Sequence, residues 1–221
     1  MEQKKGIDER IEELALIAKG LGHDLRFKLY EKLLKNKNQE VLVIELSKMV
    51  GSSYRNVQVH LQFLVNAGLV RLDTEAYPTT VRILKSVHIF EKRVMTSNKE
   101  EIRSLDIHES IKNFGDMVLF SDKIADYEEV TDREKIVRIA NGLGHKTRIY
   151  IMVLFSILPL MQSITMIEKK LRGTPYESSN RNVSQHIDKM AQAGIVHILK
   201  EYREKCVYVD KVIKIETRDV I

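Results

Sequence analysis

The sequence predicts a mainly α-helical α+β fold in which one small domain is built twice. Three stretches of the first half return in the second half in the same order: 18–26 as 140–148, 52–61 as 178–187, and 66–70 as 192–196. The offset is 148 − 26 = 122 from Arg26 to Arg148 and 186 − 60 = 126 from His60 to His186. A small insertion in the second copy explains the difference. The repeat therefore divides the 221 residues into two domains with modest cores.

The apolar spacing of the first copy predicts four helices and then two strands. We expect the helices over 8–19, 25–35, 43–49 and 54–67, with a short strand at 41–42. Ser52 and Ser53 form the turn and the cap before the fourth helix, and Gly68 ends it. Strands are expected over 69–73 and 80–90, around a polar tip at 74–79.

The second copy follows the same plan. It opens with a capping-box pattern at 131–134. A first helix is expected over 132–141, a second that ends at about 158, a third over 164–171 and a fourth over 180–193. A longer loop, 173–176, precedes the last helix. Strands are expected over 196–201 and 206–212, around a tip at 202–205, and 211–221 is expected to be strand and tail.

An acidic, partly helical connector over 91–131 is expected between domain 1 (1–90) and domain 2 (132–221). A capping-box pattern at 97–100 opens a predicted helix with one apolar face, formed by Ile107, Ile111, Phe114 and Val118. Because this face is too apolar for a free linker, we expect it to pack on a domain or to pair with a second chain. The apolar second helix of domain 2 is the next candidate for a homodimer interface.

Short helices, a tight turn between the third and fourth, and a two-stranded tip are typical of the winged helix-turn-helix. The motifs resemble those of the ArsR-type transcription regulators: a Leu-Gly-x-x-x-Arg start at 21–26, Val-x-x-His-Leu at 57–61 and Ala-Gly-Leu-Val at 67–70. The second copy repeats them in weaker form. The resemblance covers both halves and omits the connector, and it implies a regulator that binds double-stranded DNA. The cysteine pairs of metal-sensing members and their dimer-forming helix after the wing are missing.

The predicted DNA-reading helices carry polar and arginine side chains on one face and apolar ones on the other. The apolar set is expected inside: Val57, Leu61, Leu64 and Val65, and Val183, Ile187 and Met190. Arg suits guanine and Gln or Asn suits adenine, while serine at a helix start and basic wing residues suit phosphate. The candidate DNA-binding residues are Ser53, Tyr54, Arg55, Gln58, Gln62, Thr80 and Arg82 in the first copy and Ser179, Asn180, Arg181, Ser184, Gln185, Lys189, Arg203 and Lys205 in the second.

Several residues have a structural alternative. His60 and His186 are expected to be packed, hydrogen-bonded residues, and Arg26 and Arg148 either contact phosphate or form a structural salt bridge. A net charge of +5 is compatible with a polyanionic partner. The alternative function is a tandem winged-helix adaptor that binds proteins and does not read DNA.

No signature of an enzyme, a metal site or a bound cofactor is found, so we expect none of these. The apolar stretch 149–167 has the length of a membrane span. Because Pro159 and several polar residues interrupt it, we expect two helices and no membrane contact. The single cysteine, Cys206, and a charged start after Met1 predict a cytoplasmic protein.

Overall fold

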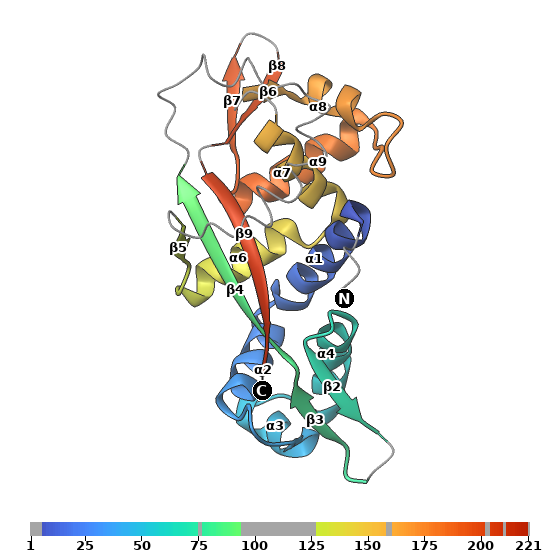
Figure 1. Cartoon of the computed structure of the whole chain (residues 1–221), viewed down its shortest axis with the longest axis vertical. Helices are drawn as coiled ribbons and strands as arrows, with labels where there is room; N and C mark the ends of the chain where they lie inside the picture. Colours follow the sequence, from blue (N-terminus) through green and yellow to red (C-terminus); the bar gives the residue numbers. More distant parts are fainter. Residues whose placement is uncertain are drawn as a thin grey trace.

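The computed structural model describes residues 6–74, 77–93, 127–157, 161–201, 204–209 and 211–220, which form a mixed α+β structure (Figure 1). The first half contains α1 (Ile7–Leu21), α2 (Asp24–Lys35), β1 (Val41–Leu42), α3 (Val43–Val50), α4 (Tyr54–Asn66), β2 (Val70–Asp73), β3 (Thr80–Ile83) and β4 (Lys85–Arg93). The second half contains β5 (Glu128–Glu129), α6 (Arg133–Leu143), α7 (Lys146–Ile157), β6 (Met161–Ser163), α8 (Ile164–Leu171), α9 (Asn180–Gln192), β7 (His197–Glu201), β8 (Glu204–Tyr208) and β9 (Lys211–Asp219). Apart from β5, the second half repeats the element order of the first.

Polar caps begin the helices where the sequence predicts them. The hydroxyl oxygens of Ser53 and Ser179 accept hydrogen bonds from the backbone N–H groups of Asn56 and Asn182, which starts α4 and α9 at equivalent positions. At α6 the capping side chain is Asp132, which accepts from the N–H of Lys135 at 2.9 Å. The capping box expected with Thr131 and Glu134 is therefore not formed: Asp132 caps the helix, and Lys135 stands where a capping box needs Glu or Gln. The helix expected from Ser97, with its apolar face, lies outside the described residues.

Two strands expected to be single are each divided in the structure. The run 80–90 separates into β3 and β4 at Leu84, where the N–H groups of Leu84 and Lys85 both donate to the carbonyl of Leu69. The run 206–212 divides in the same way between β8 and β9. The alternation of apolar residues is interrupted at each division, at Leu84 to Ser86 in the first run and at Asp210 and Lys211 in the second. The sequence pattern does not show that the parts on either side pair with different strands. The consequence is large, because the two parts join different sheets.

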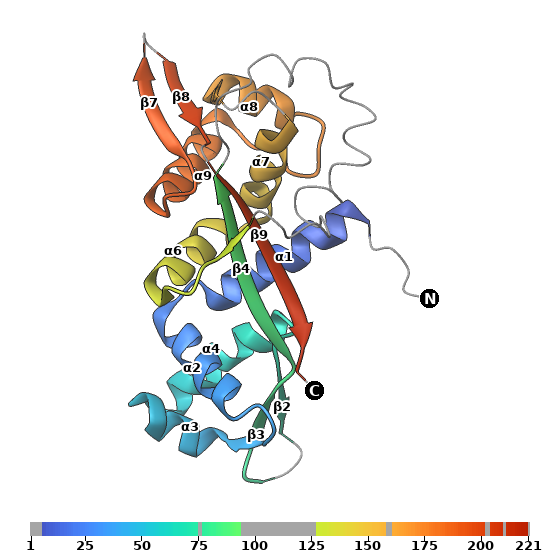
Figure 2. The ribbon, with the colours of Figure 1, turned by 60° about the vertical axis from the view of Figure 1, so that its left-hand side comes forward.

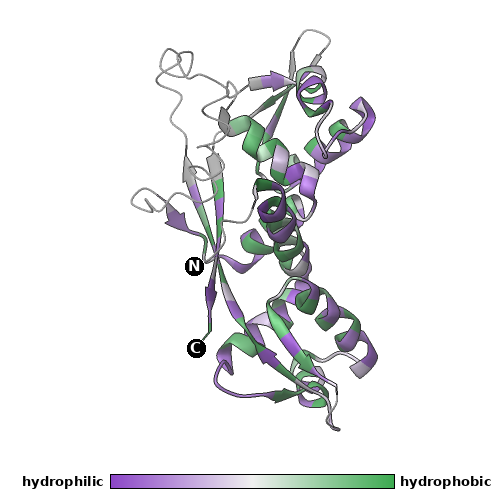
Figure 3. Ribbon diagram, turned by 45° about the vertical axis from the view of Figure 1, so that its right-hand side comes forward, coloured by the Kyte–Doolittle hydropathy of each residue, from purple (hydrophilic) through white to green (hydrophobic). Residues whose placement is uncertain are grey.

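The strands form three small antiparallel sheets. Two of them are equivalent, with strand orders β1-β3-β2 and β6-β8-β7, and each closes one half of the molecule. The third sheet, β5-β4-β9, belongs to both halves. Its two long strands make a ribbon that crosses in front of α1 (Figure 2), and hydrophobic and hydrophilic residues alternate along it (Figure 3).

The ribbon has the register of a two-fold axis. Ile89 pairs with Ile215, and the offset of 215 − 89 = 126 equals that between the repeated histidines. At the ends of the ribbon Lys85 pairs with Asp219 and Arg93 with Lys211. Each half therefore contributes the same strand in the same way, as two identical subunits do in an isologous dimer.

The first helices of the two halves cross against each other beside the ribbon. A Cβ on Gly22 would lie 2.6 Å from the backbone N of Asn141, and a Cβ on Gly144 would lie 3.1 Å from the Cα of Lys19. The contacts are reciprocal, since Gly144 and Asn141 are the counterparts of Gly22 and Lys19 at the offset of 122. Only glycine permits this approach of the two backbones, which gives the repeated Gly-Leu-Gly a packing role.

The apolar residues of α7 are buried inside the chain. Ile149, Ile151, Met152, Val153 and Phe155 are each at most 6% exposed, because α7 packs against α1, α6 and α9. These five side chains are therefore not available to a second chain, and the described residues give no support to a homodimer interface on this helix. Within the described residues no helix is long and apolar enough to span a membrane.

The insertion in the second copy has a structural role. Its loop carries Tyr176, which is buried, stacks on Tyr150 at 4.5 Å between ring centroids, and donates a hydrogen bond to Asp8 at 2.7 Å. Asp8 lies in the first turn of α1, so the insertion joins the second half to the first helix of the other half. The first copy, which is shorter here, has no equivalent contact among its described residues.

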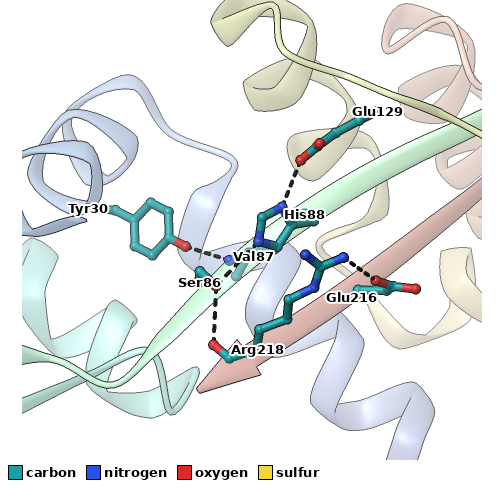
Figure 4. A network of polar contacts seen from close by, with 7 residues as sticks. All are labelled: Tyr30, Ser86, Val87, His88, Glu129, Glu216 and Arg218. Carbon is teal, nitrogen blue, oxygen red and sulfur yellow. Dashed lines mark hydrogen bonds and ion pairs between the residues drawn. The ribbon is translucent and has the colours of Figure 1, made fainter. Parts of the chain in front are cut away.

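Polar contacts attach the ribbon to both halves (Figure 4). The Tyr30 hydroxyl accepts a hydrogen bond from the N–H of Val87 at 2.6 Å, and the His88 ring is 2.7 Å from a carboxylate oxygen of Glu129. Ser86 donates to the carbonyl of Arg218 at 3.2 Å, from β4 to β9. Burial is the larger of two influences on the Tyr30 hydroxyl and raises its pKa, so it remains a neutral hydrogen-bonding group.

Candidate nucleic-acid interface

The predicted DNA-reading helices are equivalent elements of the two halves. α4 begins at Tyr54 and α9 at Asn180, and 180 − 54 = 126 is again the repeat offset. α1 packs against α4, α6 packs against α9, and α1 and α6 cross between them. α4 and α9 lie on the side of the molecule away from the ribbon of β4 and β9 (Figures 1 and 3).

The predicted division of α4 into two faces is confirmed by its burial. Val57, Leu61 and Leu64 are fully buried and Val65 is half-buried. The candidate residues Tyr54, Arg55, Gln58 and Gln62 are all exposed. Their side chains therefore form one continuous polar face that a partner can reach.

Two pairs of side chains on that face are linked along the helix. Gln58 donates to the Tyr54 hydroxyl at 3.0 Å and Gln62 donates to Asn66 at 3.0 Å. Surface hydrogen bonds of this kind exchange readily with other partners and also limit rotamer freedom before binding. Arg55 makes no hydrogen bond or ion pair with any described residue, so its guanidinium is available.

α9 presents a similar exposed polar face that carries more charged residues than that of α4. Val183, Ile187 and Met190 are fully buried, as predicted, while Arg181 and Gln185 are exposed and make no polar contact within the described part of the chain. Asn180 is also exposed and lies 3.5 Å from a carboxylate oxygen of Glu168. Arg181 is therefore the direct counterpart of Arg55 in both position and availability.

Three side chains at the wing side of α9 bind one another. The Lys205 ammonium is 3.3 Å from the Ser184 hydroxyl and forms an ion pair with the Asp188 carboxylate. Ser184 and Lys205 are half-buried by this arrangement. Both side chains therefore have partners within the chain, and their contact with DNA stays a prediction. Sequence reasoning missed Asp188, although its position one turn after Ser184 and opposite a wing lysine could have indicated it.

The wing residues of the first half lie on β3. Thr80, on the central strand of its sheet, is half-buried and donates a hydrogen bond to Glu40 at 3.1 Å. Arg82 is exposed and pairs in register with Arg71, and both line a hollow of about 210 Å³ together with Glu40 and Asp73. The two carboxylates offset the two guanidinium groups. Arg203, the predicted wing arginine of the second half, lies outside the described residues.

The capping serines use only part of their hydrogen-bonding capacity. Ser53 and Ser179 are exposed, and each hydroxyl oxygen accepts a backbone N–H of its helix. The hydroxyl proton of each serine can still be donated. A phosphate oxygen at either helix start would meet this donor and the positive end of the helix dipole.

Each half also contains a repeated histidine pair beside an arginine. His23 and His60 have ring centroids 4.6 Å apart, and His145 and His186 are 4.5 Å apart. Each first histidine accepts a backbone N–H through Nδ1, from Leu25 or from Thr147, and so caps its helix. The packed role expected of His60 and His186 is confirmed, but Nδ1 of His60 is buried without a hydrogen-bond partner.

The repeated arginines differ in their surroundings. Arg26 lies over the Phe63 ring, with its guanidinium carbon 4.5 Å from the ring centroid. Arg148 is only 6% exposed, and its Nε and one terminal nitrogen have no hydrogen-bond partner. Neither arginine forms an ion pair with a described residue, so the salt bridge considered for them is not formed.

Burial and surrounding cations keep the second histidine pair neutral. Burial has the largest effect on His186, followed by His145, Arg148 and Lys189, and together they lower its pKa to about 4. The pKa of His145 is lowered by burial and then by Arg148. Within the described residues no group of three His, Cys, Asp or Glu side chains could hold a metal ion.

Comparison with known proteins adds no assignment: the profiles of known protein families do not match the chain, and neither does any curated protein sequence.

Proposed function

We propose that each half is a winged helix-turn-helix domain and that the chain is a sequence-specific regulator of transcription that binds double-stranded DNA through α4 and α9. The observation that carries the proposal is the two-fold relation between these helices, since each presents an exposed arginine without a partner. Homodimeric helix-turn-helix proteins use the same symmetry to meet two half-sites about one helical turn, roughly 34 Å, apart. Here one chain supplies both halves.

The two faces are unequal, and this supports an asymmetric binding site. α4 offers Arg55, Gln58 and Gln62, which suit guanine and adenine edges. On α9 the position equivalent to Gln62 is Asp188, which is paired with the wing lysine. We expect the first half to contribute more base reading and the second to contribute more contact with the backbone.

A binding experiment across a salt series tests the proposal. Random duplex DNA is titrated with the full chain in a gel-shift assay at several salt concentrations. Phosphate contacts release counterions, so the affinity should fall steeply as salt rises. Absent binding, or binding that does not respond to salt, would reject DNA as the partner and favour a protein-binding adaptor.

A further inference from the structure

A surface hollow of about 240 Å³ lies between α6 and α9 in the second half. Its polar lining is formed by Arg138, Asn141, Lys189 and Gln192. None of these four side chains makes a hydrogen bond or an ion pair within the described residues. The lining contains two cations, two amides and no carboxylate, which is the donor set that suits an oxyanion.

A buried cation near Lys189 lacks compensation. Arg148 is more than nine-tenths buried and has two guanidinium nitrogens without an acceptor. The His145 and His186 rings are 4.5 Å apart, and Arg148 follows His145 by three residues in α7 as Lys189 follows His186 by three in α9, so both cations lie beside the same ring pair. No carboxylate contributes to the pKa of Arg148, His145 or His186. Arg148 does not line the hollow, so an anion held there by Lys189 would stabilise this buried charge by electrostatic attraction and not by a hydrogen bond.

The equivalent positions in the first half lack the two cations that line the hollow. The counterpart of Lys189 is Phe63 (189 − 126 = 63), whose ring covers Arg26, and the counterpart of Arg138 is Leu16 (138 − 122 = 16). The aromatic ring gives that guanidinium a favourable contact. The second half has an ammonium group in place of the ring, beside a guanidinium with two unpartnered buried nitrogens, where Arg26 has one.

We propose that Lys189 and Arg138 form an oxyanion site that binds a phosphate group, is favoured by the buried charge of Arg148, and exists only in the second half of the chain. The chemistry fits a phosphate of the DNA backbone or a free phosphate equally well. If the source is DNA, the inference rests on the proposed function and assigns to the second half a backbone contact on the side of α9 away from the wing.

Inorganic phosphate is the probe that tests the site without DNA. Nitrogen-labelled full-length protein is titrated with phosphate, against chloride at equal ionic strength, and the Nε–H resonance of Arg148 is followed by NMR. We expect a saturable shift with phosphate only. Lys189→Phe, which reproduces the first half, should weaken phosphate binding about tenfold, as expected for losing one charged contact, and Lys189→Arg should restore it. Lys189 is exposed, so neither change removes core packing.

A second titration with a short random duplex identifies the source of the phosphate. Two results together would assign a DNA phosphate. The Arg148 resonance should shift when duplex is added, and the slope of log affinity against log salt should be smaller by about one in Lys189→Phe than in wild type. A shift with inorganic phosphate but none with duplex would retain the site and reject the DNA proposal. The oxyanion site would be overturned if the Arg148 resonance shifted with neither phosphate nor duplex. It would also be overturned if the shift were the same in wild type and in Lys189→Phe.

Discussion

Ile89 in β4 lies directly opposite Ile215 in β9, and each is the counterpart of the other in the sequence repeat. In a two-fold dimer only a residue at the axis can pair with its own equivalent. The axis therefore passes between these two isoleucines. The chain has the internal symmetry of a homodimer in which the two subunits have been joined and have then diverged.

The close approach of the two first helices gives the first prediction. Gly22→Ala would put a methyl group 2.6 Å from the backbone N of Asn141, where no flexible side chain can give way. We expect a loss of about 1–3 kcal/mol in the free energy of unfolding, measured by chemical denaturation. Gly6→Ala is the matched control, because a methyl group there meets nothing within 4 Å. Equal stability of the two variants would contradict the backbone contact.

The Tyr30 hydroxyl gives a second prediction about stability. Tyr30 is 2% exposed and its hydroxyl is the acceptor for the N–H of Val87. Tyr30→Phe keeps the ring but leaves that N–H without a partner, so we expect a loss of about 1–3 kcal/mol in the free energy of unfolding. Tyr77→Phe, at a side chain 99% exposed, should change stability by less than about 0.5 kcal/mol. A Tyr30→Phe variant as stable as wild type would mean that Val87 has another acceptor.

Much of the fold could be predicted because local signals and burial agree. The positions of α3, α8 and the start of α4 follow from serine caps, turns and apolar spacing, and their bounds differ little from those expected. The ribbon could not be predicted. Its strands follow the preceding strands after only one or two residues, and their pairing joins residues about 126 apart in the chain, for which a single sequence has no local signal.

The prediction of the candidate site was most accurate for which side chains of α4 and α9 are exposed. Arg55 and Arg181 are exposed at equivalent positions because the helix period fixes which face is buried. The ion pair of Lys205 could not be predicted, because its partner, Asp188, lies on another element and a long side chain can reach it. Charge on a single element predicts availability poorly when the tertiary neighbours are unknown.

The exposed arginines of α4 and α9 provide the direct test of base reading. Against a duplex selected by the wild-type protein, Arg55→Ala and Arg181→Ala should each weaken binding by about 1–3 kcal/mol if the side chain contacts guanine. Lys37→Ala removes one positive charge from an exposed turn and controls for net charge. If both arginine variants bind as tightly as wild type, these helices do not read the duplex.

The ion pair between Lys205 and Asp188 links β8 to α9 in the second half. Asp188→Asn keeps the shape of the side chain, removes a negative charge from α9 and frees the ammonium group. Binding to random duplex should therefore strengthen, and the salt dependence should steepen by about one phosphate contact. Glu9→Gln makes the same charge change at an exposed position of α1 and should have a smaller effect. Weaker binding by Asp188→Asn would show that the pair supports the active conformation.

The His186 ring predicts how stability depends on pH. Its pKa is about 4 in the folded chain, below the usual 6.5, because burial and the charges of His145, Arg148 and Lys189 disfavour the protonated ring. Between these values the unfolded chain binds more protons than the folded one, so stability falls as the pH drops from about 6.5 toward 4. Thermal unfolding should show this decrease, and His186→Gln should reduce it because glutamine does not titrate. His197→Gln, at an exposed position, should retain it. An unchanged pH profile in His186→Gln would place the acid sensitivity elsewhere.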